Sequence, residues 1–249
     1  MDYRIIDTIP TDTIVLTFIN YKYVPMFKVF YKYFQRYDLQ NLLVICLDKE
    51  SQKELVDLGV RTMFVDYTIQ DICEFWQFRL TIINNVFKYS EKNIIHTDVD
   101  CFWLKNIMLL FDALPDYDII SHVAFGHPIQ IVEQIGFVMC CGLYLLRYNT
   151  KNMRFLDRIL AQHLNFVDDQ VYFNHYIYTN YRLIEHGTIN DVLYKKILLN
   201  DGTRMGILKP QIVSREYYEN LYCFHPVLDA DDMDEKLRIL SKYLEIDAL

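Results

Sequence analysis

Residues 93–104 read Asn-Ile-Ile-His-Thr-Asp-Val-Asp-Cys-Phe-Trp-Leu. The segment begins as an apolar run typical of a buried strand and leads into two aspartates, Asp98 and Asp100, spaced by one residue. On a strand, such side chains point to the same face, roughly 6 to 7 Å apart. Two carboxylates there repel each other and resist desolvation unless a cation lies beside them. The pattern indicates a site for a hard divalent ion, Mg²⁺ or Mn²⁺, and an acidic turn without a ligand is the alternative.

Upstream of this segment, apolar runs alternate with helical patterns. Strands are predicted at residues 13–18, 42–47 and 61–66, and helices at about 25–37, 49–58 and 71–89. This order predicts an α/β fold with a mostly parallel central sheet, right-handed crossovers and flanking helices. Ligands of such sheets bind beyond the carboxyl ends of the strands. Asn20, Asp66 and Asp98 all lie near such ends, so we expect them to converge on one crevice.

After residue 105 the pattern becomes mixed. Strands are predicted at 118–123 and at 137–146, the second interrupted at Cys141-Gly142, with a loop over 126–136 between them. Helices are predicted from 150 to about 165, from Asp168 through His175, and over 233–243. Short strands are expected around 182–184 and 197–199, with a hairpin turn at 200–202. Without linkers or repeats, residues 1–249 are expected to form one domain.

Composition excludes several classes of protein. Of the 249 residues, 52% are hydrophobic, which argues against a disordered chain, and the net charge of −8 argues against nucleic acid as a main partner. Six cysteines show no zinc spacing and fall largely in apolar runs, as buried reduced thiols do. No apolar run approaches about 18 residues and no signal peptide is recognisable, so we expect a cytoplasmic protein without a membrane span.

Three further residues are candidates for chemistry, each with a plain alternative. Asp169 opens an apolar helix, where ordinary capping would also place an aspartate. His225, between Phe224 and Pro226, would complete an octahedral site with the two aspartates and phosphate oxygens, or is a structural histidine. Arg79 would suit a diphosphate through its planar fork, or is a surface cation. Phosphate-binding P-loop, dinucleotide and nucleophile-elbow motifs are absent from the sequence.

The order of these features resembles the nucleotide-sugar glycosyltransferases of the GT-A fold, and the nucleotide-diphospho-sugar transferase family in particular. Residues 94–104 match the family's acidic motif. Residues 140–144 resemble its "N-t-G-f" strand, and residues 169–174 match its "D-Q-x-x-f-N" helix. The likeness extends over about residues 13 to 240. Cys141 departs from the family's polar residue there, and the glycine usual after the C-terminal histidine is absent from residues 227–230.

The resemblance implies a metal-dependent transfer of sugar from a nucleoside-diphosphate sugar, with UDP-sugar favoured, to a glycan, protein or lipid-linked acceptor. It implies a nucleotide-binding half over about 13–105 and an acceptor half over about 106–249. Mn²⁺ or Mg²⁺ would be held by three ligands, and other residues would contact the donor. The implied metal ligands are Asp98, Asp100 and His225; the implied donor contacts are Asn20, Asp66, Arg79, Asp98 and Lys236; Asp169 would face the sugar or acceptor.

The residues themselves leave other functions open. A sugar-nucleotide-binding protein without transfer would need the same acidic pair, and a phosphoryl or nucleotidyl enzyme would use the same ion but release phosphate or pyrophosphate. An α/β interaction module would leave the aspartates on the surface. Within the transferase hypothesis, Asp169 would deprotonate the acceptor hydroxyl in an inverting enzyme or stabilise a positively charged sugar in a retaining one.

Overall fold

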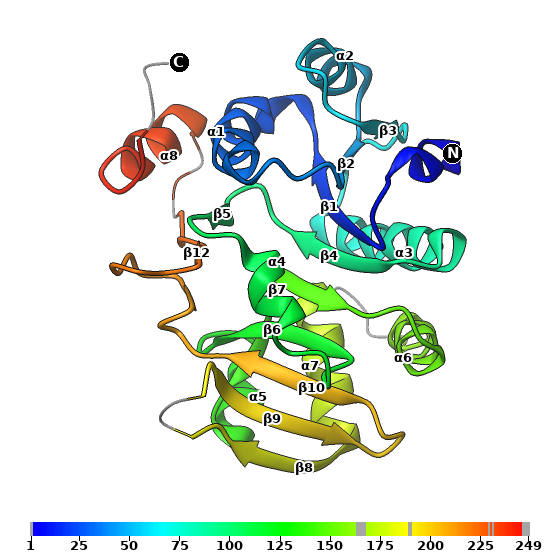
Figure 1. The fold of residues 1–249 in the computed structure, drawn as a ribbon, viewed down its shortest axis with the longest axis vertical. Coiled ribbons are helices and arrows are strands. Elements are labelled where there is room, and N and C mark those ends of the chain that lie inside the picture. The colour runs from blue at the N-terminus through cyan, green and yellow to red at the C-terminus, as the bar shows by residue number, and fades with distance from the viewer. Residues whose placement is uncertain (1, 163–167, 189–190, 229, 231, 246–249) are drawn as a thin grey trace.

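A nine-stranded mixed sheet runs through the molecule (Figure 1), with strand order β3-β2-β1-β4-β7-β6-β10-β9-β8. This computed structural model describes residues 2–162, 168–188, 191–228, 230 and 232–245. In the order of the sheet, the strands are β3 (Thr62–Phe64), β2 (Leu42–Cys46), β1 (Thr13–Ile19), β4 (Asn93–Thr97), β7 (Val138–Leu146), β6 (Ile119–Ala124), β10 (Arg204–Leu208), β9 (Leu193–Leu199) and β8 (Tyr181–His186).

The first four strands of this order are mutually parallel, as the sequence predicts. The connecting helices are α1 (Val24–Phe34), α2 (Lys49–Asp57) and α3 (Ile72–Ser90). Alternate residues of β1 enter different cores, with Ile14 and Leu16 on one face and Val15 on the other. Both faces are therefore covered, which explains why the predicted strands lack polar alternation.

Each face of the sheet has its own helical layer. One core includes residues of α3, α6 (Thr150–Leu160) and α7 (Asp169–Asn180). The other includes residues of α1, α4 (Ile107–Asp112), α8 (Met233–Leu240) and a small sheet of β11 (Val213–Ser214), β12 (Cys223–Phe224) and β5 (Phe102–Trp103). Residues 98–101, which contain Asp98 and Asp100, form the acidic turn. Because β5 directly follows this turn and β12 directly precedes His225, the small sheet joins two predicted site segments.

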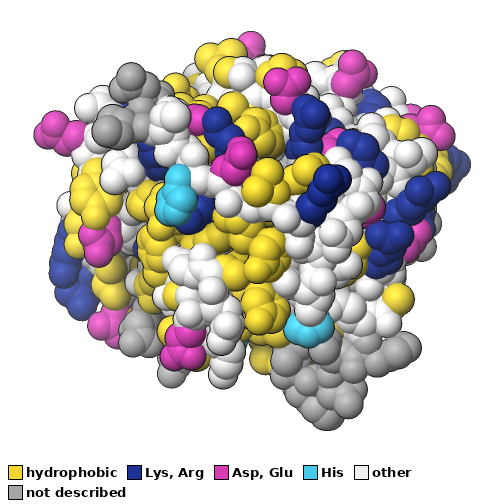
Figure 2. Space-filling view, turned by 90° about the horizontal axis from the view of Figure 1, so that it is seen from below, with side chains coloured by type: hydrophobic (Ala, Val, Ile, Leu, Met, Phe, Trp, Pro, Cys, Tyr) yellow, Lys and Arg dark blue, Asp and Glu magenta, His cyan; other side chains and the backbone are white. Residues whose placement is uncertain are grey.

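The sheet changes direction at β7, which is antiparallel to both β4 and β6. Beyond it, β10 is parallel to β6 and forms a hairpin with β9. The hairpin turn contains Gly202 at φ +84°, a conformation that glycine adopts without steric cost. At the β8 end, Tyr181 and Leu183 are exposed, and Figure 2 shows hydrophobic side chains gathered in the middle of the face seen from this end.

Two predictions in the mixed part need correction. The expected loop over 126–136 contains a helix, α5 (Ile129–Ile135), which follows Pro128 and ends at Gly136 in the left-handed conformation at φ +82°. Ile131 and Ile135 are four residues apart, and Ile129 and Val132 are three apart, which is helical spacing, but a segment of seven residues carries this signal weakly. The strand expected to break at 141–142 is continuous as β7, but its pairing with β6 shifts opposite those residues.

Boundaries differ in a few further places. β3 is shorter than the predicted strand 61–66, and α7 continues five residues beyond the predicted end at His175. α6 ends at Leu160 rather than near residue 165, and residues 163–167 lie outside the described part. Asn149 caps α6 by accepting from the Asn152 amide. Within the described residues, we find no helix with the length and apolar character that crossing a membrane requires.

Candidate active site

The acidic turn follows the carboxyl end of β4, near the centre of the sheet. The Asp98 backbone N–H donates to the Gly142 carbonyl on β7 at 2.8 Å, and the Cys101 N–H donates to the Asp98 carbonyl at 3.1 Å. These bonds fix the turn between two central strands. The side chains of Asp98 and Asp100 are each 31% exposed, so both carboxylates reach the surface while their backbone is held in the interior.

Arg79 of α3 lies under this turn with only 5% of its side chain exposed. Its Nη1 donates to Asp98 Oδ1 at 2.9 Å and its Nε donates to Asp169 Oδ2 at 3.0 Å, while Nη2 also contacts Asp169. The guanidinium carbon lies 4.3 Å from the ring centroid of Trp76. Arg79 is thus a buried cation shared by two carboxylates, rather than the surface cation that the sequence left as an alternative.

The residues at the start of α7 attach this helix to both Arg79 and β7. Asp168 caps the helix, and Asp169 is 3% exposed and pairs with Arg79. The Cys141 amide of β7 donates to Gln170 Oε1 at 3.2 Å. Asn174 accepts from the Met139 amide at 2.7 Å and donates to the Met139 carbonyl at 2.8 Å. The three polar residues of the "D-Q-x-x-f-N" motif, Asp169, Gln170 and Asn174, therefore each contact Arg79 or strand β7.

His225 approaches the acidic turn from the other side, and 2% of it is exposed. Its Nε2 lies 3.4 Å from Asp100 Oδ1 and 4.0 Å from Asp98 Oδ2. The ring packs on Gly142: a Cβ added there would lie 1.9 Å from His225 Cε1. Glycine is required at this position of β7 because the imidazole occupies the space of a side chain.

The charges of this region shift the pKa values of its groups. Burial lowers the pKa of Arg79, but Asp169 and Asp98 raise it more, so the net pKa is above its ordinary value. Burial raises the pKa of Asp98, whereas Arg79 and a hydrogen bond from His96 lower it more, and the net pKa is depressed. For Asp169, burial has the larger effect and raises the pKa against the opposing effect of Arg79. Asp98 is therefore an anion at neutral pH.

His225 behaves differently because its partners are anionic or thiol groups. Burial and the nearby Arg215 lower its pKa, but hydrogen bonds with Asp100 and Cys140 raise it to about 10. In the metal-free protein the imidazole is thus protonated at neutral pH. A cation bound beside Asp100 would replace that proton, since a ligating histidine must be neutral.

A pocket opens beside the acidic turn. Its polar lining is formed by Asn20, Arg79, Asp98 and Asp100, and its remaining lining is chiefly apolar and aromatic: Phe18, Ile19, Tyr23, Leu47, Ile69, Ile72, Phe75, Trp76 and Val99. Asn20 Oδ1 is buried without a hydrogen-bond partner. An apolar pocket with a few convergent polar groups, one of them unsatisfied, is typical of a small-molecule site.

The predicted residues are not all gathered here. Asn20, Arg79, Asp98 and Asp100 line the pocket, and His225 and Asp169 contact residues of that lining. Asp66 is exposed after β3, and neither it nor Lys236 belongs to the lining that the described residues form. Lys236 of α8 is nevertheless close, because its Nζ lies 3.5 Å from the hydroxyl of Tyr23, which does line the pocket.

Several residues of the site escaped the sequence prediction. Trp76 is one helical turn before Arg79, and its ring could have been recognised as a partner for a cation at that spacing. His96, on β4 itself, contacts Asp98 Oδ1 through Nε2 at 3.2 Å. His122 and Cys140 lie behind His225, and no spacing in the sequence relates these three residues.

The donor atoms present suit a divalent cation. One ligand atom from each of Asp98, Asp100 and His225 falls within 4.8 Å of the others. Two carboxylate oxygens and an imidazole nitrogen form a ligand set that Mg²⁺ and Mn²⁺ accept, with further positions for phosphate oxygens. The residues therefore fit the ion implied by the family resemblance.

The sequence places this fold in a class, the glycosyltransferases that use nucleotide sugars. The model of the nucleotide-diphospho-sugar transferase family matches residues 38–218, more than half of the chain, and the protein belongs to that family. The family confirms the predicted class of enzyme, a glycosyltransferase. No curated protein matches the chain significantly.

Solved structures share the fold at low sequence identity. A glycosyltransferase involved in glycosylation of the major capsid of PBCV-1 superposes with a TM-score of 0.52 at 10% identity, over 91% of this chain and 98% of that one. Mouse xyloside xylosyltransferase 1 gives 0.51 at 13% identity, over 87% and 98%. Glycosyltransferase GlyE of Streptococcus pneumoniae TIGR4 gives 0.56 at 13% identity, over 95% of this chain and 61% of that one. The predicted α/β fold class, of GT-A type, is confirmed.

Proposed function

We propose that the protein moves a sugar from a nucleoside-diphosphate sugar to an acceptor hydroxyl with the help of Mn²⁺ or Mg²⁺. The observation that carries this proposal is the convergence of Asp98, Asp100 and His225 beside a pocket that contains Arg79 and Asn20. A divalent cation held by the first three residues would neutralise the charge that develops on the leaving diphosphate.

The protein's own groups have distinct parts in this proposal. Arg79 holds the Asp98 carboxylate ionised and oriented, and it lines the pocket where the donor would bind. The Asn20 Oδ1 acceptor needs a donor from the ligand. Uracil and guanine offer a ring N–H and cytosine and adenine offer an amino group, so this acceptor is compatible with each base. UDP is favoured through the family resemblance, and GDP, CDP and ADP are the alternatives to test.

Asp169 has a more constrained position than a free base would have. It is 3% exposed, and its Oδ2 atom, which would accept a proton, already accepts a hydrogen bond from Arg79 Nε. We propose that it sets the position of Arg79 in the resting protein and acts on the acceptor or the sugar only when that pair opens. If Asp169→Asn kept full transfer together with full donor affinity, Asp169 would have no part in the reaction.

The two halves of the chain have different parts in this proposal. All residues lining the pocket come from the half at about 13–105, which supports donor binding there. Asp169 and His225 come from the half at about 106–249, to which we assign the acceptor, whether glycan, protein or lipid-linked glycan. The six cysteines are all free, which supports the prediction of a reducing compartment such as the cytoplasm.

A thermal-shift panel tests the proposal. UDP, GDP, CDP and ADP are each added with and without Mn²⁺ to wild type and to Asp100→Asn. A ligand at about 100 times its dissociation constant adds roughly 2.7 kcal/mol, which raises the unfolding midpoint by about 5 to 10 °C in a chain of this size. We expect UDP to stabilise wild type only with Mn²⁺, and not to stabilise Asp100→Asn.

Product analysis then separates transfer from related chemistry. UDP-sugars are incubated with Mn²⁺ and a range of sugar, glycopeptide and lipid-linked acceptors. Release of UDP with formation of a glycosylated acceptor supports the proposal. Release of pyrophosphate would instead indicate a nucleotidyl enzyme, and a flat shift panel without turnover would contradict donor binding itself.

A further inference from the structure

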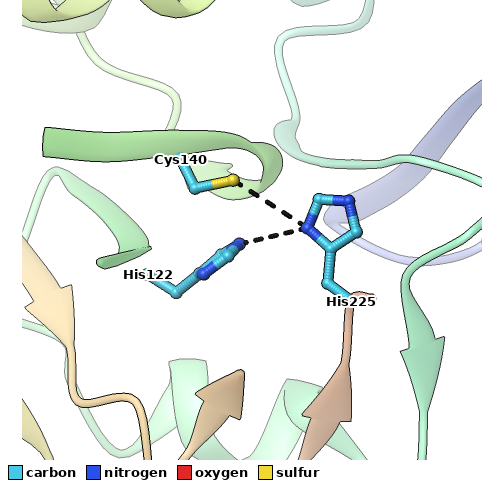
Figure 3. A group of neighbouring side chains, drawn as sticks. All are labelled: His122, Cys140 and His225. Atoms are coloured by element: carbon cyan, nitrogen blue, oxygen red, sulfur yellow. Dashed lines mark hydrogen bonds between the residues drawn. The ribbon is translucent and has the colours of Figure 1, made fainter. Parts of the chain in front are cut away.

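His225 lies between two groups of possible metal ligands. Its Nε2 faces Asp98 and Asp100, whereas its Nδ1 faces His122 and Cys140 (Figure 3). His122 and Cys140 are paired across strands β6 and β7, so the fold holds their side chains next to each other. His122 and Cys140 are fully buried and His225 is 2% exposed.

The spacing in this second group is longer than hydrogen bonds require. His122 Nε2 lies 3.5 Å from His225 Nδ1, and Cys140 Sγ lies 3.9 Å from the same nitrogen. A hydrogen bond between two nitrogens would bring them to about 3 Å. Tetrahedral zinc, with bonds of about 2.05 Å to nitrogen and 2.3 Å to sulfur, places two nitrogens roughly 3.4 Å apart and nitrogen and sulfur roughly 3.6 Å apart. The observed separations are close to these values.

The kind of donor atom selects the kind of ion. Two imidazoles and a thiol suit borderline and soft transition ions such as Zn²⁺ and Co²⁺, whereas Mn²⁺ and Mg²⁺ prefer the oxygens of Asp98 and Asp100. Arg215 Nη2 lies 3.2 Å from the same Cys140 sulfur and would oppose an added cation. Arg215 is only partly buried, so its charged head can turn toward solvent when an ion arrives.

We propose that His122, Cys140 and His225 form a second metal site, which binds Zn²⁺ or a similar thiophilic divalent ion. Binding uses the thiolate of Cys140 and the Nδ1 lone pair of His225, so the proton that His225 carries on Nδ1 in the metal-free protein is released. A neutral imidazole has one free lone pair, so His225 then carries its proton on Nε2 and cannot ligate a cation beside Asp100. We call the group of His122, Cys140 and His225 the soft site, and the group of Asp98, Asp100 and His225 the hard site. Binding of an ion at one therefore excludes binding at the other, and this exclusion rests on the metal site of the proposed function.

Co²⁺ is the probe for the site itself. It is titrated into reduced, metal-free protein without oxygen, and we expect a thiolate-to-cobalt charge-transfer absorption that saturates at one ion per chain. Cys140→Ser should remove this absorption and His122→Asn should weaken it. Cys141→Ser is the matched control, because Cys141 is the next residue of β7 and is equally buried, yet belongs to the core on the opposite face.

A second control addresses the other neighbouring thiols. Cys101 and Cys223 have their sulfurs 3.0 Å apart, so Cys101→Ser shows whether that pair binds the probe. The soft site is overturned if folded wild type shows no charge-transfer band, if Cys140→Ser retains it, or if Cys141→Ser or Cys101→Ser removes it. Circular dichroism establishes folding for each variant, and the wild-type titration decides even if Cys140→Ser does not fold.

The exclusion is tested with Mn²⁺ and UDP bound. Free Mn²⁺ is followed by electron paramagnetic resonance while Zn²⁺ is added, and we expect stoichiometric release from wild type and from Cys141→Ser but not from His122→Asn. Equal release from His122→Asn would overturn the exclusion. If Mn²⁺ does not bind wild type at all, the metal dependence proposed above fails, whereas the cobalt absorption still decides the soft site.

Discussion

The two sides of the acidic turn are built differently. On the Arg79 side, the distances are those of hydrogen bonds, 2.9 Å to Asp98 and 3.0 Å to Asp169, so each charge has a partner within the protein. On the His225 side, the nearest separations are 3.4 Å to Asp100 and 3.5 Å to His122. The first region is complete without a ligand, whereas the second has the spacing of groups that share an ion.

This difference separates stability from binding. A buried ion pair leaves an uncompensated charge when one partner is removed, so the Arg79 side should affect folding whether or not a ligand is present. On the His225 side, Asp100 and the protonated imidazole also attract each other in the metal-free protein, but at 3.4 Å. Loss of Asp100 should therefore affect folding less than loss of Arg79, and it should appear chiefly in metal binding.

The largest effect is expected from Arg79→Met, which keeps much of the side-chain volume but removes the charge. Asp169 would remain buried without its partner, and we expect a loss of about 3 to 5 kcal/mol in the free energy of unfolding. Urea denaturation without metal measures it. Lys88→Met is the matched control on the same helix, because the pair of Lys88 with Asp157 is largely exposed and should contribute less than about 1 kcal/mol. Equal losses in the two variants would contradict the comparison.

The Arg79 pair also shows where sequence reasoning reaches its limit. A basic residue on the helix before the acidic segment could be predicted, but its partner Asp169 lies 90 residues further along the chain. The periodicity of residues 71–89 gives Arg79 apolar neighbours such as Phe75 and Ile82, but it does not specify what lies opposite Arg79. Burial and pairing of such a residue depend on tertiary contacts that a local pattern does not contain.

The first four strands could be predicted because local signals agree there. Strands β1 and β2 are continuous apolar runs. Gly59, at φ +75°, lies just beyond the end of α2, and Asp71 caps α3. The mixed half lacks that redundancy: β6 pairs with β10, about 85 residues away, through no pattern visible in either strand. The group of His122, Cys140 and His225 is hidden for the same reason, since it forms only when β6, β7 and β12 are assembled.

Gly142→Ala should have the next largest effect, and it acts on the His225 side. The added Cβ would meet the imidazole at 1.9 Å, and the ring must move because β7 is a central strand. We expect about 1 to 3 kcal/mol of destabilisation together with loss of Mn²⁺ binding. Thermal unfolding and a Mn²⁺ titration measure the two effects.

Gly206→Ala provides the comparison for overpacking alone. Its Cβ would first meet the flexible end of Leu193 at 3.0 Å and then the ring of Tyr117 at 3.3 Å, neither of which is a predicted metal ligand. This variant should keep Mn²⁺ binding. If Gly142→Ala bound Mn²⁺ as well as Gly206→Ala does, His225 would not be a ligand.

Asp100→Asn should lower metal binding more than it lowers stability, and its loss of stability should be smaller than that of Arg79→Met. Loss of a residue that only hydrogen-bonds to a metal ligand costs roughly 10- to 100-fold in metal affinity, and loss of a direct ligand should cost at least about 100-fold. Calorimetric titration with Mn²⁺ in the presence of UDP measures the affinity, with the exposed Asp57→Asn as the control of equal charge change. A metal-free unfolding midpoint that fell as far as in Arg79→Met would break the division between the two regions.

The smallest effect is the pH dependence of His225. Because its pKa in the metal-free fold is raised to about 10, its contribution to stability is complete below its ordinary pKa and is lost as the pH rises through about 10. Metal affinity follows the opposite direction, since the cation must displace that proton: between pH 7 and 9 we expect the Mn²⁺ affinity to rise about tenfold per unit. Calorimetry in buffers of different ionisation enthalpy should report one proton released per ion. In Asp100→Asn, which removes the partner that raises this pKa, any residual binding should release less than one proton, and an unchanged value would show that the released proton comes from another group.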